Sequence, residues 1–406
     1  MKGGLVSMNI KLDMMQTTAL AVAVYYFGAW LKTKWTMLER FCIPAPVVGG
    51  LVFAIVNLIL NQTNALHLTL DTTLQKPFMM VFFTSIGMGA SIELIKKGGL
   101  QVIIFWLCAC TLCICQDVVG VTLAKILGKS PLLGLLCGSI TMTGGHGTGA
   151  AFGPLFEKSY GVVGATTTAM ASATFGLVMG SIIGGPVGKR LIDKKNLKSP
   201  GNSPEAAETV AATTVIDEKI NYEELFKTLG IILISIGVGA VLEKFFVSLG
   251  ITLPSYVNSM IIAAILLNVG ESTGKWHVNQ KCTDVLGNIG LNVFLSMALV
   301  GLKLWELAAV AGPMLIILVA QTTLMALFAT FITYNFLGKD YDAAVMAAGH
   351  CGLGLGAGPN ALANERAVME EYGYSELGWL LFPALALVVD DIFNPLVISG
   401  IMSLYK

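Results

Sequence analysis

Apolar stretches near the length needed to cross a lipid bilayer dominate this 406-residue sequence. A spanning helix needs about 20 mostly apolar residues, because roughly 30 Å of hydrocarbon must be crossed at about 1.5 Å per residue. Charged residues make up 12% of the chain, well below the roughly 25% of a soluble domain. We therefore expect an all-α integral membrane protein with about ten transmembrane helices. The predicted spans are 14–31, 43–60, 77–95, 99–117, 162–188, 225–247, 255–270, 284–304, 307–335 and 377–403.

Two glycine-rich stretches, each with one histidine, lie between these spans. They read SITMTGGHGTGAAFGP from residue 139 and AAGHCGLGLGAGPNA from residue 347. Segments 131–157 and 340–366, which contain them, are too polar and broken for ordinary spanning helices, yet too apolar for surface loops. We expect each segment to form a re-entrant hairpin.

The spacing of the two stretches predicts an internal repeat. His146 and His350 are 204 residues apart, and similar pairs of motifs begin at 43 and 253 and at 84 and 296. We predict a five-helix repeat in residues 1–190, a charged, flexible linker at 191–224, and a second repeat in 225–406. Because five spans are an odd number, the second repeat should be inverted relative to the first, as in many secondary transporters.

The basic residues predict the orientation in the membrane. With the N-terminus outside, nine lysines lie on the outer side, which leaves the other 16 of the 25 basic residues inside. The positive-inside rule therefore favours periplasmic termini and a cytoplasmic linker. The apolar run that follows Lys2 and Lys11 continues through Leu31, so we expect an uncleaved first span rather than a signal peptide. The nine outer lysines are Lys2, Lys11, Lys76, Lys125, Lys129, Lys158, Lys244, Lys303 and Lys406.

Glycine-rich backbone at membrane depth has a physical use. Non-helical backbone there must bury its polar groups in protein or face a polar cavity, and glycine allows a ligand or helix to come close. Hairpins that enter from opposite faces would bring their tips together near the midplane, where a helix N-terminus suits a carboxylate. The candidate substrate contacts are Thr143, Gly144, Gly145, His146, Gly147, Thr148, Gly349, His350, Gly352, Gly354 and Asn360.

Acidic residues inside a span predict a cation site. Asp390 and Asp391 precede Asn394 and Pro395, and the proline would free backbone carbonyls one turn earlier. Hydroxyls of the first glycine stretch can also ligate a small hard cation. The candidate cation ligands are Asp390, Asp391, Asn394, Ser139 and Thr141.

Each of these features also has a purely structural interpretation. Small residues are common where membrane helices touch, so the glycines could serve packing alone. The histidines could hydrogen-bond hairpin backbone, contact substrate or hold a metal, and the acidic pair could be a packed polar pair. Three further acids fall near predicted span ends, where solvated carboxylates are ordinary: Asp117, Asp284 and Glu306. The four cysteines in CACTLCIC spread around one helix, which indicates a packing or lipid-facing surface.

Three long motifs resemble the bacterial sodium/glutamate symporter family. They are GSITMTGGHGTGAA, MALVGLKLWELA and KDYDAAVMAAGHCGLGLGAGPNALAN, in this order along the chain. The resemblance implies Na⁺-coupled uptake of L-glutamate across the bacterial inner membrane by alternating access, in a homodimer in which a transport domain moves against a scaffold. Its partners would be the lipid bilayer and the two transported solutes, with no cofactor and no nucleic acid.

Two other functions remain open at this point. The same architecture would suit a Na⁺- or proton-coupled symporter of another organic anion or amino acid. A passive ion channel with the hairpins as its filter is the alternative from a different class. An enzyme is not expected, because no nucleophile and base pair is apparent beyond the two histidines.

Overall fold

The computed structural model of the chain describes residues 8–41, 43–92, 99–199, 220–248, 253, 255–308, 310–375 and 393–403. In the first half, the elements are β1 (Met8–Leu12), α1 (Met14–Lys34), α2 (Thr36–Arg40), α3 (Ala45–Gln62), β2 (Leu66–Leu70), α4 (Gln75–Gly87), α6 (Gly99–Ile126), α7 (Pro131–Leu136), α8 (Gly145–Tyr160) and α9 (Ala165–Lys195). In the second half, they are α11 (Tyr222–Ser248), α12 (Ser255–Thr273), α13 (Gln280–Val300), the 3₁₀ turn η1 (Leu304–Leu307), α14 (Ala311–Phe328), the π-helical segment η2 (Ala329–Thr333), α15 (Tyr334–Phe336), α16 (Tyr341–Leu355), α17 (Gly358–Tyr372) and α19 (Asn394–Ser403).

The protein is a helical membrane protein. Among the described residues, six helices are long and apolar enough to cross a bilayer: α3, α6, α9, α11, α13, and α14 continued through α15. Large apolar side chains such as Ile234, Val241 and Phe331 are exposed on these helices. Exposed apolar surface on this scale is costly in water, and it is expected where the surroundings are lipid.

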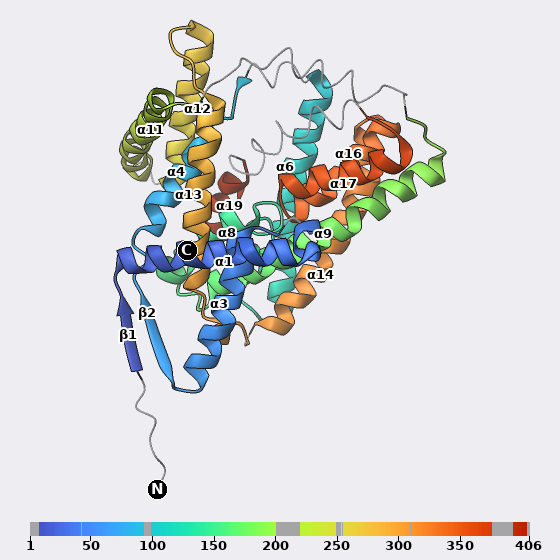
Figure 1. Cartoon of the computed structure of the whole chain (residues 1–406). Helices are drawn as coiled ribbons and strands as arrows, with labels where there is room; N and C mark the ends of the chain where they lie inside the picture. The colour runs from blue at the N-terminus through green and yellow to red at the C-terminus, as the bar shows by residue number, and fades with distance from the viewer. Residues whose placement is uncertain are drawn as a thin grey trace.

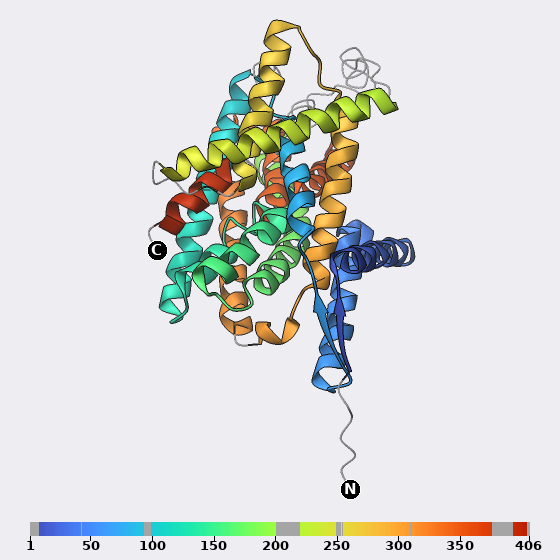
Figure 2. The same ribbon diagram turned by 90° about the vertical axis from the view of Figure 1, so that its left-hand side faces the viewer.

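The helical fold also contains one small parallel sheet, which the sequence analysis did not predict. Strands β1 and β2 pair in parallel, from Met8 opposite Leu66 to Leu12 opposite Leu70. They project from the helical body next to α3 (Figures 1 and 2). Both segments lie outside every predicted span, so the search for long apolar runs could not find them.

Several predicted span boundaries also need correction. Helix α4, which begins within the predicted span 77–95, ends at Gly87, and α13, in the predicted span 284–304, ends at Val300. The Gly87 Cα lies against the backbone of Met260 in α12, at a distance that would exclude a side chain. In contrast, α6 continues nine residues beyond its predicted end at 117, to Ile126.

The helices form two bundles, and each bundle draws on both halves of the chain. We call α1, α3, α4, α11, α12 and α13 the first bundle, because each packs against others of this group. The second bundle contains α6, α7, α8, α9, α14, α16 and α17. The two groups lie on opposite sides of Figure 1, with α8 and α19 near the centre of the view. The first three long helices of each half thus build one bundle, and the helices that follow build the other.

Aromatic side chains line the contact between the bundles. The rings of Phe83 on α4 and Tyr256 on α12 stack with centroids 4.1 Å apart, and Phe152 of α8 meets Tyr256 edge-on. Gly147 of α8 packs against the rings of Phe82 and Phe83. The helix that follows the first glycine-rich break, α8, therefore packs against the first bundle through aromatic rings.

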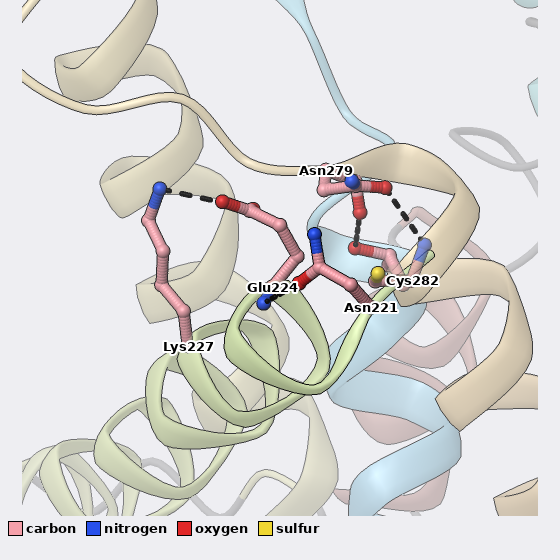
Figure 3. A network of polar contacts seen from close by, with 6 residues as sticks. Asn221, Glu224, Lys227, Asn279 and Cys282 are labelled. Carbon is pink, nitrogen blue, oxygen red and sulfur yellow. Dashed lines mark hydrogen bonds and ion pairs between the residues drawn. The ribbon is translucent and has the colours of Figure 1, made fainter. Parts of the chain in front are cut away.

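Asparagine caps define the starts of two helices in the second half (Figure 3). The Asn221 side chain accepts a hydrogen bond from the N–H of Glu224 at 2.9 Å, at the start of α11. The Asn279 side chain accepts one from the N–H of Cys282 at 2.9 Å, at the start of α13. Each cap satisfies a backbone donor that the first turn of a helix leaves unpaired.

Candidate functional site

Each predicted hairpin segment is a pair of helices separated by a non-helical break. In the first segment, α7 ends at Leu136, residues 137–144 form turns, and α8 begins at Gly145. In the second, α16 ends at Leu355 and α17 begins at Gly358 after only two residues. Each glycine-rich segment is thus interrupted, as its composition predicted, although the interruption does not lie at every glycine.

The two breaks meet in the second bundle. A side chain on Gly145 would place its Cβ 2.6 Å from the carbonyl oxygen of Gly356. Gly145 also has φ of +58°, a backbone conformation that favours glycine. The backbone of one break therefore contacts the backbone of the other directly.

Gln116 of α6 links the two segments by hydrogen bonds. Its Nε2 donates to the carbonyl oxygen of Gly354 at 2.6 Å, and its Oε1 accepts from the Thr143 hydroxyl at 2.7 Å. Gln321 of α14 in turn donates from Nε2 to the backbone carbonyl of Gln116 at 2.7 Å. Gln116 and Gln321 are 205 residues apart, close to the spacing of the two histidines. Sequence analysis missed both glutamines, although this spacing could have revealed them.

Asp117 lies beside the first break and is fully buried. Its carboxylate accepts two hydrogen bonds from Ser139, one from the backbone N–H at 2.8 Å and one from the hydroxyl at 2.9 Å. The prediction that Asp117 is a solvated carboxylate at a span end was wrong, because α6 extends nine residues beyond it. A buried acid held by the break itself is a stronger functional candidate than a surface acid.

The predicted cation ligands are partly brought together. Asn394 of α19 donates from Nδ2 to the carbonyl oxygen of Ser139 at 2.9 Å, and Ser139 in turn bonds Asp117. Thr141 donates its hydroxyl to the carbonyl of Leu136 at 2.6 Å. Asp390 and Asp391 lie outside the described residues. Within the described part of the chain, no group of three or more His, Cys, Asp or Glu side chains is close enough to hold a metal ion.

The two histidines occupy separate positions, and each bonds a threonine hydroxyl rather than hairpin backbone. His146 Nε2 lies 3.0 Å from the hydroxyl of Thr174 on α9. His350 Nδ1 lies 2.7 Å from the hydroxyl of Thr333, at the end of the π-helical segment η2. A π-helical turn re-aims the side chains around it and is common at functional sites, and here it places Thr333 against the histidine.

Asn360 at the start of α17 ties the second break to α9. Its Nδ2 donates to the carbonyl oxygen of Leu177 at 2.7 Å, whereas its Oδ1 is buried without a partner. Thr148 of α8 likewise has a buried hydroxyl with no partner in the described structure. Asn394 Oδ1 and Gln321 Oε1 are also buried without a hydrogen-bond partner among the described residues. Because buried polar groups are nearly always paired, four such atoms on elements around the breaks indicate a place for a polar ligand.

The glycines of the second segment mostly serve helix packing. A Cβ on Gly349 would overlap the side chain of Glu365, and one on Gly352 would lie 2.5 Å from the Ala361 nitrogen. A Cβ on Gly354 would overlap Leu112 and Met325. These contacts favour the packing interpretation for Gly349, Gly352 and Gly354.

The glycines of the first segment differ in what an added Cβ would contact. A Cβ on Gly144 would meet the Thr148 side chain at 2.6 Å, whereas one on Gly147 would approach a ring carbon of Phe82 at 3.3 Å. Only Gly145 meets the other break.

The comparison with known proteins decides the family. A family model described as "Sodium/glutamate symporter" matches residues 10–374. The chain belongs to the sodium/glutamate symporter family. It is 42% identical over 390 residues to the sodium/glutamate symporters of Escherichia coli (strain K12) and Shigella flexneri, covering 96% of this chain and 97% of each relative. It is 40% identical over 384 residues to that of Haemophilus influenzae, covering 93% of this chain and 94% of the relative.

The part of the chain that matches the symporter family contains the candidate site. The matched region includes both helix breaks, Gln116, Asp117 and Gln321. A symporter binds a solute and a driving ion, and breaks in membrane helices supply backbone groups that can bind both.

Proposed function

We propose that the protein takes up L-glutamate together with Na⁺ across the inner membrane of a bacterium by alternating access. One observation carries the proposal beyond family membership: the two helix breaks meet backbone to backbone between Gly145 and Gly356. Secondary transporters bind substrate near such breaks, where helix ends and freed backbone groups are available.

Glutamate would bind where the breaks meet. Helices α8 and α17 both begin at this point, at Gly145 and Gly358, and helix N-termini favour negative charge. The unpaired hydroxyl of Thr148 can donate to a carboxylate, and the unpaired Oδ1 of Asn360 can accept from the substrate ammonium. The remaining candidate contacts are Thr143, Gly144, His146, Gly147 and His350, whereas the close contacts of Gly349, Gly352 and Gly354 favour a packing role for these three.

Sodium would bind beside the first break. Na⁺ is a hard cation that takes oxygen ligands, and the Asp117 carboxylate, the Ser139 hydroxyl and the unpaired Asn394 Oδ1 supply them. Asp390 and Asp391 stay candidate ligands from the chain segment just before Asn394. The Thr141 hydroxyl would take part only after releasing the Leu136 carbonyl.

The architecture we propose is two inverted five-helix repeats, residues 1–190 and 225–406, joined by a cytoplasmic linker at 191–224. Segments 131–157 and 340–366 would be re-entrant hairpins. The composition of the two bundles supports this arrangement, since each takes corresponding helices from both halves. The second bundle, which holds both breaks, would move against the first through the aromatic contact. We further propose a homodimer with periplasmic termini.

Uptake into proteoliposomes tests this function. With an inward Na⁺ gradient, labelled L-glutamate should accumulate above its external concentration, and it should only equilibrate after the gradient is collapsed. Unlabelled D-glutamate, aspartate and citrate as competitors would define the substrate class. Accumulation of citrate or another anion in preference to glutamate would contradict the substrate assignment, and passive equilibration under every gradient would indicate a channel.

The inverted repeat predicts that linker and C-terminus lie on opposite sides of the membrane. Single cysteines, Glu205→Cys in the linker and Tyr405→Cys at the C-terminus, should react with a membrane-impermeant maleimide from opposite faces. In intact cells, maleimide added from the periplasmic side should label only the C-terminal cysteine. The reactive native cysteines are replaced beforehand. Labelling of both from the periplasm would disprove the inverted arrangement.

A further inference from the structure

Glu365 is a buried acid that the proposed glutamate and sodium sites do not use. It lies at the middle of α17, with 1% of its surface exposed. Both of its carboxylate oxygens are fully enclosed, and neither has a hydrogen-bond partner among the described residues. Such an acid within a membrane protein is rare and is usually tied to ion or proton movement.

The packing of α17 on α16 creates the space that the carboxylate occupies. The side chain lies against Gly349 of α16, where any Cβ would overlap the carboxyl group. The neighbouring Asn364 fixes the rotation of α17, because its Nδ2 donates to the carbonyls of Gly180 at 3.0 Å and Ala348 at 3.3 Å. Glu365 is therefore held against helix backbone.

No charged group of the adjoining helices pairs with Glu365 in the described structure. Lys189, the nearest lysine along α9, bonds Glu371 at 2.6 Å instead. His350 is next to Gly349 on α16, but its ring lies between Phe105 and Phe328 and bonds Thr333. The charged or titratable residues of the three helices around Glu365 are Lys189, Arg190, Asp193, Lys194 and Lys195 on α9, Tyr341, Asp342, His350 and Cys351 on α16, and Arg366, Glu370, Glu371 and Tyr372 on α17.

An ionised carboxylate in this position would be costly, because a buried charge needs a counter-charge or several hydrogen-bond donors. Either a proton or a metal cation can remove that cost. A sodium ion requires a shell of several oxygen ligands, yet the residue packed against the carboxylate, Gly349, offers none from a side chain. A proton requires only one carboxylate oxygen, so the geometry favours a proton.

We propose that Glu365 is a proton-binding site, and that the proton travels with glutamate and Na⁺ on the second bundle. This inference rests on the proposed symport, since α16 and α17 belong to the bundle that holds the glutamate site. A proton from water on the outer side forms an O–H bond with the carboxylate before the carboxyl group is enclosed against Gly349. The same bond breaks when the group is exposed to the cytoplasm, and the proton returns to water.

Proton movement can be followed during glutamate uptake. Purified protein is placed in proteoliposomes that contain a pH-sensitive dye, with an inward Na⁺ gradient and the membrane voltage clamped by potassium and valinomycin. L-Glutamate added outside should acidify the interior in proportion to the labelled glutamate taken up. Glutamate stays anionic between about pH 6 and 8, so the substrate itself supplies no proton. Wild-type protein that takes up glutamate without acidification overturns the inference even if no variant folds.

Two variants assign the proton to Glu365. Glu365→Gln preserves the shape of the protonated carboxyl group and should abolish the acidification and the pH dependence of uptake. Glu370→Gln, which changes an exposed glutamate on the same helix, should leave both unchanged. Calorimetry of glutamate binding in two buffers of different ionisation enthalpy should detect linked proton uptake in wild-type protein and none in Glu365→Gln.

The outcomes separate this inference from the proposed function. Absence of Na⁺-driven glutamate uptake by wild-type protein would contradict the symporter function itself. Normal Na⁺-driven uptake with acidification that persists in Glu365→Gln would contradict only the assignment to Glu365. A large rise in the Na⁺ concentration for half-maximal uptake in Glu365→Gln, without loss of acidification, would make Glu365 a sodium ligand instead.

Discussion

Asp117→Asn should raise the Na⁺ concentration for half-maximal glutamate uptake by at least an order of magnitude. The carboxylate accepts both the N–H and the hydroxyl of Ser139, whereas an amide offers one oxygen and turns an NH₂ group toward the other donor. Loss of a hydrogen bond to a charged group costs about 1.5–3 kcal/mol, and about 1.4 kcal/mol corresponds to tenfold in an equilibrium constant. The measurement is the initial rate of labelled glutamate uptake against Na⁺ concentration.

Two control variants distinguish the effect of the Asp117 charge from an effect on the structure of the break. Ser139→Ala removes the hydroxyl, both as a donor to Asp117 and as a proposed Na⁺ ligand, but it keeps the carboxylate charge and the bond from the backbone N–H. Its effect should therefore be smaller than that of Asp117→Asn. Asp71→Asn changes an exposed acid at the turn before α4 and should leave the Na⁺ dependence unchanged. If Asp117→Asn folds and keeps the wild-type Na⁺ dependence, the cation site lies elsewhere, with Asp390 and Asp391 as the next candidates.

The wrong prediction for Asp117 shows that local sequence does not determine where a membrane helix ends. A glutamine and an aspartate after an apolar run are typical of a membrane boundary, and the fourth predicted span ends at 117. In the structure, Ser139 and Thr143 satisfy these side chains, so α6 can bury them and continue to Ile126. The partners lie more than 20 residues away in sequence, so local composition could not predict them.

The glycine stretches teach a related lesson about helix breaks. Their composition correctly predicted that each segment is interrupted, yet it could not predict where. Gly349, Gly352 and Gly354 all lie inside α16, because neighbouring side chains and backbone fill the space that a Cβ would need. The break comes at Gly356 instead. A glycine that permits close packing and a glycine that permits a turn look alike in sequence.

The spacing of the two glycine-rich stretches was the most informative feature of the sequence for the site. The spacing of 204 residues predicted two corresponding glycine-rich segments, and their tips were expected to come together. In the structure, the break at Gly145 contacts the break at Gly356. The same spacing relates Gln116 to Gln321, which are also hydrogen-bonded neighbours. Composition alone did not single out these glutamines, because one glutamine in an apolar helix is ambiguous until its partners are known.

Gly145→Ala should reduce glutamate uptake by more than an order of magnitude while Gly161→Ala stays close to wild type. Both glycines have positive φ, +58° at Gly145 and +66° at Gly161, so alanine at either position should cost about 1–2 kcal/mol in backbone strain. Only at Gly145 would the added Cβ meet another atom, the Gly356 carbonyl oxygen at 2.6 Å, whereas nothing lies within 4 Å at Gly161. The difference between the variants therefore isolates the contact between the two breaks.

Thermal stability in detergent and Na⁺-driven uptake should be measured together for both variants. If the contact between the breaks forms part of the glutamate site, Gly145→Ala should lose far more uptake than its loss of thermal stability accounts for. Gly161→Ala should show a similar backbone cost in stability and retain uptake, because its side chain points into open space. Loss of stability and uptake in the same proportion in both variants would reduce Gly145 to a structural turn. The meeting of the breaks would then describe how the second bundle folds, and glutamate would have to bind elsewhere.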